Sequence, residues 1–222
     1  MQTGYETLSA PANMTRPKQS DQSTIFLLRH GETASPQGIF YGQQDVALSE
    51  RGIAQSVAVA ARLEKEGLDM VVTSDLERCR FMGKAIAEKA GLSLETEPGL
   101  REGDFGRWTG LAWQEIEKEY PDEAAEWIRD PAGTTPPDGE SISSLKRRVM
   151  QVFNAICMKK GRKKIAVVAH GGVNRAIISE LLGIKPEFMF RISQDFACIN
   201  VMELYEQQYW SVRHINMPLN IL

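Results

Sequence analysis

Short, continuous apolar runs alternate along the chain with longer segments in which apolar residues recur every three or four positions. Three of the runs are rich in Val, Ile and Leu and predict buried strands at 24–28, 70–73 and 164–169. The periodic segments predict helices, and most of these are bounded by Ser, Gly or Pro. The predicted helices cover residues 50–66, 76–90, 111–119, 121–129, 141–160 and 173–182.

The amphipathic pattern is clearest in the helix predicted over 50–66, where Ser49 takes the N-cap position. Its apolar stripe should face the core. The stripe consists of Ile53, Val57, Ala60, Ala61 and Leu63. Ser74 and Asp75 are expected to cap the following helix in the same way.

Alternating polar and apolar residues predict three weaker strands at 92–96, 197–204 and 209–215. The order of strands and helices predicts an α/β fold with three α-β-α layers and a mostly parallel sheet that has one antiparallel edge. We expect a single domain over residues 24–222, with a helical insertion at about 111–160. Residues 1–23 are polar and lack an apolar stretch, so we expect a disordered leader rather than a signal peptide.

Composition argues against several classes of protein. The formal net charge of −3 argues against a nucleic-acid-binding surface. No apolar run approaches the roughly 18 residues that a membrane span needs. The cysteines, Cys79, Cys157 and Cys198, are widely spaced and odd in number. This pattern is neither a disulfide framework nor a zinc site, and it indicates a reducing, cytoplasmic setting.

Candidate chemistry lies where the predicted strands end. Arg29 and His30 follow the first strand and His170 follows the strand that ends at residue 169, each histidine directly before a glycine. Ligands of open α/β sheets bind at these carboxyl ends. A guanidinium binds oxyanions, and imidazole can act as nucleophile or base near neutral pH. A single histidine is more often structural, and we expect this of His214, but two at equivalent strand ends favour a shared site.

Two further residues complete a candidate phosphate site. Arg78 lies one turn into the helix after the second strand; alone it would be an ordinary surface arginine, but beside Arg29 it would form the second half of a clamp for a dianion. Glu102 lies in a glycine-rich loop, where no helical packing role explains it, and its carboxyl group suits a general acid. Asp104 in the same loop is a competing candidate, and spacing alone does not decide between them.

The ordered motifs resemble those of the histidine phosphatase superfamily, whose fold is called phosphoglycerate-mutase-like. The motifs are Arg29-His30-Gly31-Glu32-Thr33, Thr73-Ser74-Asp75-Leu76-Glu77-Arg78, Leu100-Arg101-Glu102, Gly139-Glu140-Ser141 and Val168-Ala169-His170-Gly171. The first motif alone is a weak signal, whereas the whole set in this order is specific. The resemblance extends from residue 24 to the end and implies phosphoryl chemistry.

The resemblance also implies roles for individual residues. His30 is the expected phosphate-accepting nucleophile, and Arg29, Arg78 and His170 are expected to complete the phosphate pocket. The family's proton donor corresponds to Glu102, which is thereby preferred over the other carboxylate of its loop. Further substrate contacts are expected at Tyr41, Gly42, Gln43 and Gly171. Neither a metal ion nor another cofactor is expected, because arginine and histidine side chains supply the positive charge.

One position departs from the family pattern. Pro36 stands where many members have an asparagine that contacts the phosphate, so substrate contacts in this loop are expected to differ. The loop and the segment 194–200 are most similar to the α-ribazole phosphatase branch, which acts in cobalamin synthesis. Phe40 and Tyr41 flank the nucleophile and are candidates to stack on a ring of the substrate.

The sequence leaves three functions to compare. A metal-independent phosphomonoesterase acting on a small ester such as α-ribazole 5′-phosphate is the first. A phosphoglycerate-type mutase would need further cationic groups to retain a bisphosphate, but the acidic segment 111–138 carries only Lys118 and Arg129. The presence of all five key residues argues against an inactive phosphate-binding module. No nucleic-acid or membrane partner is expected, and a homodimer is compatible with the sequence.

Overall fold

The computed structural model describes residues 22–36, 38–159, 164–205 and 209–219. They form a six-stranded sheet in the order β3-β2-β4-β1-β5-β6. The strands are β1 (Gln22–Arg29), β2 (Met70–Thr73), β3 (Leu94–Thr96), β4 (Lys164–Ala169), β5 (Ile199–Tyr205) and β6 (Tyr209–Met217). The predicted leader lies outside the described residues, except that Gln22 and Ser23 already belong to β1.

The pairing of the strands confirms the predicted sheet. β1 is parallel to β4, and β2 is parallel to both β3 and β4. β5 is antiparallel to β1 and β6 is antiparallel to β5, which makes the predicted antiparallel edge. β2 is buried throughout and β4 is buried beyond its first residue, as expected for parallel strands with helices on both faces.

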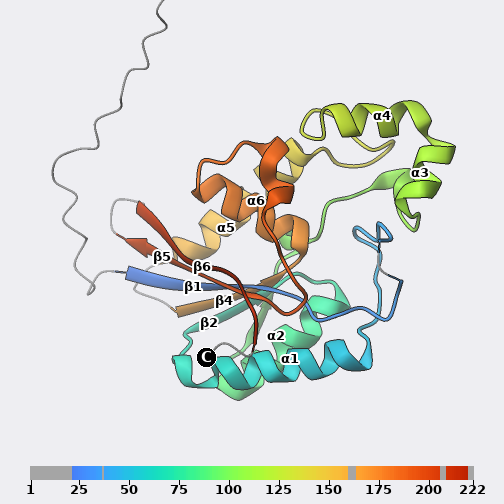
Figure 1. The fold of residues 1–222 in the computed structure, drawn as a ribbon. Helices are drawn as coiled ribbons and strands as arrows, with labels where there is room; N and C mark the ends of the chain where they lie inside the picture. Colours follow the sequence, from blue (N-terminus) through green and yellow to red (C-terminus); the bar gives the residue numbers. More distant parts are fainter. Residues whose placement is uncertain (1–21, 37, 160–163, 206–208, 220–222) are drawn as a thin grey trace, which may run out of the picture.

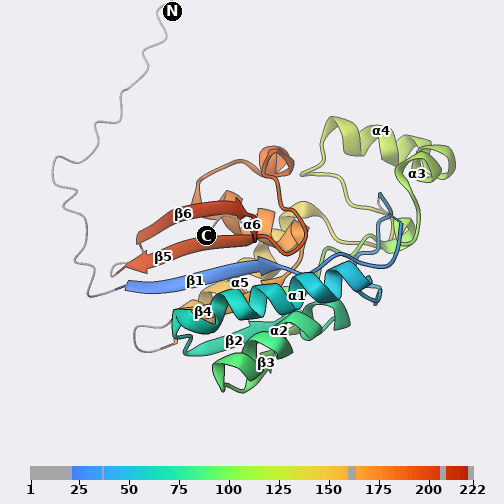
Figure 2. The same cartoon turned by 60° about the horizontal axis from the view of Figure 1, so that its bottom comes forward.

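Helices cover both faces of the sheet, and the three-layer prediction is confirmed (Figures 1 and 2). One face carries α1 (Glu50–Leu63) and α2 (Glu77–Ala90), and the other carries α5 (Ile142–Cys157) and α6 (Gly171–Leu181). Short 3-10 helices lie between the main elements: η2 (Glu64–Glu66), η3 (Pro98–Leu100), η4 (Gly106–Trp108) and η5 (Pro186–Arg191). Among the described residues, none of the helices is both long and apolar enough to cross a membrane.

Alternate residues of β1 pack into opposite layers. Phe26 and Leu28 belong to the hydrophobic cluster with α1 and α2, whereas Ile25 and Leu27 belong to the cluster with α5 and α6. Successive side chains of a strand point to opposite faces, so a continuous apolar run is what a strand between two helical layers requires. The apolar run read from the sequence therefore belongs to a strand in the middle of the fold.

The buried face of α1 differs from the prediction. Only Ala60 and Leu63 of the predicted stripe are buried. The exposed members are Ile53, Val57 and Ala61. The helix turns Gly52 toward the loop after β1 instead, where a Cβ atom on this residue would lie 1.9 Å from the carbonyl oxygen of Glu32. The close contact between Gly52 and the Glu32 backbone fits the observed rotation of α1 about its own axis. The hydrophobic pattern gave no sign of this contact.

The predicted insertion at 111–160 divides into two parts with different packing. Helices α3 (Trp113–Glu119) and α4 (Pro121–Arg129) lie beyond the end of the sheet (Figure 1) and pack around the fully buried Trp108 in a small cluster of their own. Helix α5, by contrast, contributes to the main core through residues such as Phe153. The part that stands apart from the sheet is therefore shorter than predicted.

Candidate active site

Three neighbouring strands end at the same edge of the sheet and carry the candidate residues. In the parallel pair β1 and β4, Arg29 lies opposite Ala169, so His30 and His170 follow at adjacent positions. The backbone N–H of His30 donates to the carbonyl oxygen of Ala169 at 3.1 Å. β2 lies on the other side of β4 and continues through Ser74 into α2. Strand register thus brings together residues from distant parts of the sequence.

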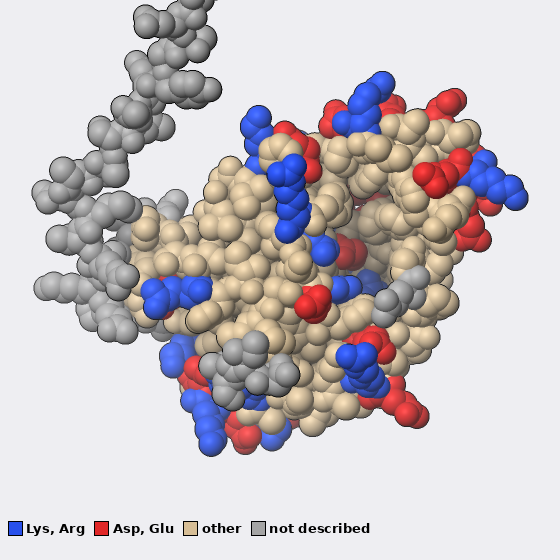
Figure 3. All heavy atoms as spheres, viewed as in Figure 1, with Lys and Arg blue, Asp and Glu red and all other residues tan. Residues whose placement is uncertain are grey.

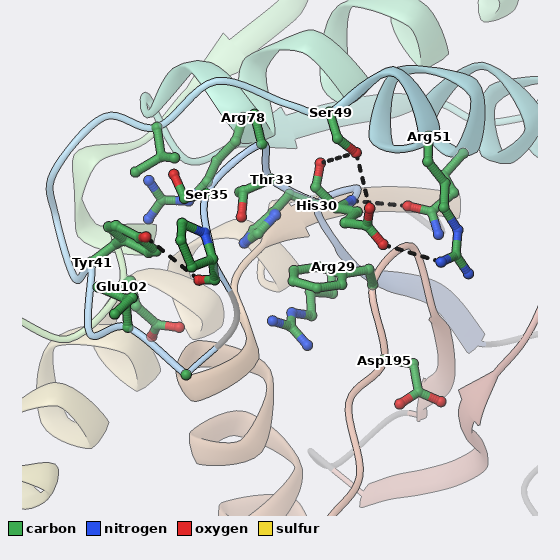
Figure 4. Close-up of a pocket in the computed structure, with 18 of the residues that line it drawn as sticks. Arg29, His30, Thr33, Ser35, Tyr41, Ser49, Arg51, Arg78, Glu102 and Asp195 are labelled. Atoms are coloured by element: carbon green, nitrogen blue, oxygen red, sulfur yellow. Dashed lines mark hydrogen bonds and ion pairs between the residues drawn. The ribbon is translucent and has the colours of Figure 1, made fainter. Parts of the chain in front are cut away.

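A cleft of about 1220 Å³ opens at this edge. Figure 3 shows a hollow below the segment with α3 and α4, in which both basic and acidic side chains are visible. Four of the five predicted catalytic residues line the cleft: Arg29, His30, Arg78 and Glu102. Figure 4 shows His30 between the two arginines. Arg29, His30 and Arg78 therefore share one cavity with the predicted acid, whereas His170, also predicted for the phosphate pocket, is not in the lining formed by the described residues.

Among the described residues, one ring nitrogen of His30 has no hydrogen-bond partner. Its Nδ1 lies 2.7 Å from the carbonyl oxygen of Gly31, and because a carbonyl can only accept, Nδ1 carries the proton and donates it. Burial, followed by the charges of Arg29 and Arg78, holds the pKa of His30 well below its usual range. The ring is therefore neutral near pH 7 and keeps a lone pair on Nε2, as a nucleophile requires.

Arg78 is buried rather than lying on the helix surface. Its Nη1 and Nη2 donate to the carbonyl oxygens of Gln44 and Gly42, both at 2.7 Å. Its Nε lies 3.3 Å from Nδ1 of His170 and donates to it. Gly42 has a positive φ, and a Cβ atom there would lie 2.8 Å from the carbonyl oxygen of Gly103, so the loop that anchors Arg78 packs directly against the glycine-rich loop.

Arg29 is oriented by contacts that the sequence did not indicate. Its Nη1 donates to the carbonyl oxygen of Gln194, and its guanidinium carbon lies 4.0 Å above the ring centre of Phe196. Its Nε is buried and has no hydrogen-bond partner among the described residues. Such a buried, unpartnered donor is uncommon and marks Arg29 as a residue whose hydrogen bonds are incomplete among the described residues.

His170 is fully buried and is not part of the lining formed by the described residues. Because Arg78 donates to Nδ1, the proton of the neutral ring lies on Nε2, which donates to Oγ of Ser74 at 2.9 Å. The centres of the two imidazole rings are 5.2 Å apart. Burial, followed by the charge of Arg78, holds the pKa of His170 well below its usual range.

The two carboxylates of the glycine-rich loop have different surroundings. Glu102 lines the cleft, and its two oxygens accept hydrogen bonds from the backbone N–H groups of Gly172 at 2.9 Å and Gly103 at 3.0 Å. Asp104 accepts a hydrogen bond from the N–H of Gly106 at 2.9 Å, and it is not among the described residues of the lining. Of these two carboxylates, Glu102 is therefore the one that faces a ligand in the cleft.

The helix that follows β2 is capped differently from the prediction. Asp45, from the loop after β1, accepts a hydrogen bond from the N–H of Glu77 at 2.8 Å. Asp75 instead forms a bidentate ion pair with Arg101, whose Nε lies 2.8 Å from Oδ1. The N-terminal end of α2 is thus tied to the loop that anchors Arg78, and the cap comes from a residue remote in sequence.

Comparison with known proteins identifies the family. A model of the histidine phosphatase superfamily (branch 1) matches residues 25–218. The chain belongs to the histidine phosphatase superfamily. The family resemblance drawn from the motifs is confirmed, and the protein is an enzyme of the histidine phosphatase type.

Three similar proteins illustrate the range of this superfamily. Phosphoserine phosphatase 1 of Hydrogenobacter thermophilus is 30% identical over 198 residues, which cover 89% of this chain and 92% of the relative. A probable phosphoglycerate mutase, GpmB, of Yersinia enterocolitica is 33% identical over 211 residues, covering 87% and 95%. The crystal structure of a putative α-ribazole-5′-P phosphatase from Escherichia coli has a TM-score of 0.81 at 26% identity, covering 87% and 96%.

The predicted substrate contacts of this histidine phosphatase fall into two groups. Tyr41 and Gly42 line the cleft, and the Tyr41 hydroxyl donates a long hydrogen bond of 3.5 Å to the carbonyl oxygen of Pro36. Gln43 and Gly171 are not part of the lining that the described residues form. Gly171 instead lies against Arg29, where a Cβ atom would come within 3.4 Å of Nε.

One wall of the cleft was missed by the sequence analysis. It includes Glu32 and Arg51, which form an ion pair at 3.2 Å, and the adjacent Asp195 and Phe196. Glu32 is part of the first family motif, and Asp195 and Phe196 belong to the segment 194–200. Neither stretch of sequence indicates that these residues line a cleft. Among the described residues, no group of three or more His, Cys, Asp or Glu side chains could hold a metal ion.

The two buried histidines should make this histidine phosphatase sensitive to mild acid. Their pKa values are lowered in the folded protein relative to about 6.5 in the unfolded chain, so below pH 6.5 the unfolded chain binds more protons. The free energy of unfolding should therefore fall as the pH decreases from 6.5 to 5, by up to about 1.4 kcal/mol per pH unit for each histidine. Urea denaturation at several pH values in phosphate-free buffer measures the slope of the free energy of unfolding against pH.

A surface histidine provides the control for this experiment. His214 is exposed on β6, so His214→Gln should retain the wild-type slope. The double variant His30→Gln/His170→Gln should lose most of it between pH 6.5 and 5. A double variant with the wild-type slope would show that other groups cause the acid sensitivity.

Proposed function

We propose that this histidine phosphatase hydrolyses a small phosphate monoester through a phosphohistidine at His30, without a metal ion. The free Nε2 of a neutral His30, between Arg29 and Arg78, is the observation that carries the proposal. Nε2 attacks phosphorus in line with the ester oxygen, the bond from phosphorus to that oxygen breaks, and the two guanidiniums balance the charge of the equatorial oxygens.

Glu102 completes the proposed cycle as acid and then as base. In the first half it donates its proton to the departing ester oxygen and becomes a carboxylate. In the second half this carboxylate takes a proton from a water molecule as that water attacks phosphorus. The bond between nitrogen and phosphorus then breaks, which releases inorganic phosphate and restores neutral His30. Its place in the lining supports this role, and the two backbone N–H groups hold the carboxyl group in position.

The wall next to the phosphate site favours an uncharged, largely apolar alcohol as the leaving group. Residues 34–46 contribute mostly small, apolar or aromatic side chains to the cleft: Ala34, Pro36, Ile39, Phe40, Tyr41 and Val46. Of the described arginines in the lining, two are assigned to the phosphate, and Arg51 is paired with Glu32. α-Ribazole 5′-phosphate, whose alcohol carries an uncharged aromatic base, has this character, and Tyr41 is the side chain proposed to stack on the base.

A phosphoglycerate-type mutase is the second candidate, because one relative with 33% identity is a probable phosphoglycerate mutase. Such a reaction must hold a second anionic group of the substrate. The arginines of α4 and η4 offer little for this, since Arg129 is paired with Glu126 and Arg107 with Asp138. Phosphatase activity is therefore the favoured proposal.

A panel of phosphate esters tests these alternatives. We expect release of inorganic phosphate from α-ribazole 5′-phosphate at a higher kcat/KM than from phosphoserine or 3-phosphoglycerate, with no isomerised product, and the same rates in excess EDTA. Isomerisation of 3-phosphoglycerate would support the mutase. Loss of activity in EDTA, restored by magnesium, would contradict the metal-independent mechanism.

Three further expectations accompany the proposal. A cytoplasmic location fits the free, buried cysteines Cys79, Cys157 and Cys198. Burial raises the pKa of Cys198, which lines the cleft, to about 11, so its thiol stays protonated at neutral pH. A homodimer and the absence of a nucleic-acid partner stay predictions from the sequence.

A further inference from the structure

The backbone that leads into Glu102 wraps around a single side chain of α5. Nη1 of Arg148 donates to the carbonyl oxygens of Gly99 at 2.9 Å and Arg101 at 3.0 Å. Nη2 donates to the carbonyl oxygen of Glu102 itself at 3.3 Å. Three of four successive residues thus direct their carbonyl groups at one guanidinium.

The same guanidinium is held from its other side by Glu140. Nε of Arg148 donates to Oε1 at 3.0 Å, and Nη2 donates to Oε2 at 2.6 Å, which is a bidentate ion pair. With these bonds all five N–H groups of Arg148 have a partner. The Arg148 side chain is only 26% exposed and that of Glu140 only 16%. Such a saturated guanidinium has one defined position, which makes it suitable as an anchor.

Two neighbouring contacts limit the movement of the loop further. A Cβ atom on Gly99 would lie 2.3 Å from a methyl carbon of Val152, so the loop backbone packs directly on α5. The N–H of Glu140 donates to the carbonyl oxygen of Asp104 at 2.7 Å. The loop is therefore attached on both sides of Glu102, by the Arg148 side chain before it and by the Glu140 backbone after it.

Arg148 does not line the cleft formed by the described residues, so any effect on the reaction must act through another group. Without its guanidinium, three backbone carbonyls and the partly buried Glu140 carboxylate would lose their donors, and the loop would shift to find others. A displacement of about 1 Å of a reacting group can cost about 100-fold in rate. The residue most directly affected by such a shift is Glu102.

We propose that Arg148, fixed by Glu140, is a positioning residue that holds Glu102 where it can protonate the leaving group. This inference rests on the proposed function of Glu102 as proton donor. It implies that loss of Arg148 slows the cleavage of esters whose leaving group needs a proton, while phosphate binding between Arg29 and Arg78 is retained.

The test compares Arg148→Met with Arg147→Met, a matched change on the exposed side of the same helix. Phenyl phosphate has a leaving group that needs protonation, and that of 4-nitrophenyl phosphate needs little. In Arg148→Met we expect kcat/KM for phenyl phosphate to fall about 100-fold, because the misplaced Glu102 protonates the leaving group poorly. We expect kcat/KM for 4-nitrophenyl phosphate to fall less than about 10-fold. Arg147→Met should match the wild type with both esters, and the dissociation constant of inorganic phosphate should stay the same in both variants.

Other outcomes would overturn the positioning role. Equal losses on the two esters together with a lower melting temperature would assign Arg148 to stability alone, and weakened phosphate binding would assign it to the anion site. If Arg148→Met does not fold, Arg148→Lys keeps the charge but has fewer donors, and the ratio of the two esters decides in the same way. A wild type that releases phosphate from neither ester would contradict the proposed function instead.

Discussion

Replacement of His30 with alanine is expected to abolish turnover, with a loss of kcat/KM on the order of 10⁴-fold or more. The alanine variant removes Nε2 of His30, which carries the lone pair that attacks phosphorus. The other ring nitrogen, Nδ1, is protonated and donates to the carbonyl oxygen of Gly31. His170 should not replace it, because its Nδ1 accepts from Arg78 and its Nε2 donates to Ser74. The loss should therefore be one of chemistry rather than of phosphate binding.

Covalent trapping gives the decisive measurement. Wild-type enzyme mixed briefly with labelled substrate and stopped in alkali should retain phosphate that is stable in base and labile in acid, as a phosphohistidine is. His30→Ala should retain none, whereas His214→Ala, altered on the exposed face of β6, should retain the wild-type amount. Label that persists on His30→Ala would place the covalent step on another residue.

Replacement of Glu102 with glutamine should produce the second-largest effect, and it should depend on the leaving group. The amide keeps the size of the side chain and can still accept from one of the two N–H groups that hold the carboxylate, but it cannot donate a proton as a carboxylic acid does. For esters with poor leaving groups, kcat/KM should fall by about 10² to 10⁴-fold. For 4-nitrophenyl phosphate the fall should be much smaller.

The slope of log kcat/KM against the pKa of the leaving group, over a series of aryl phosphates, measures this difference. Asp104→Asn is the matched control, since Asp104 does not line the cleft formed by the described residues and an asparagine can accept the same hydrogen bond from Gly106. The control should retain the wild-type slope. A steeper slope in Asp104→Asn, or the same loss for every ester in Glu102→Gln, would point to a different acid.

Much of the fold was readable from the sequence because its signals are local. The apolar run of β1 is packed between two helical layers, as its lack of alternation indicated. Ser49 caps α1 as predicted and accepts from the N–H of Gly52. The stripe of the same helix was misread, because a close backbone contact between Gly52 and Glu32 sets its rotation and such a contact leaves no trace in hydrophobic periodicity.

The sequence by itself determined that two arginines and two histidines follow strands or begin helices at one edge of a parallel sheet, since strand ends and glycine turns are local features. Only the tertiary structure decided what surrounds them. Parallel register placed His30 beside His170, and carbonyl groups of a distant loop fixed Arg78. The glycine-rich loop has no periodicity, so only the resemblance to a family pointed to Glu102 rather than Asp104. The structure adds the physical reason, since Glu102 lines the cleft and accepts from the N–H of Gly172, a residue remote in sequence.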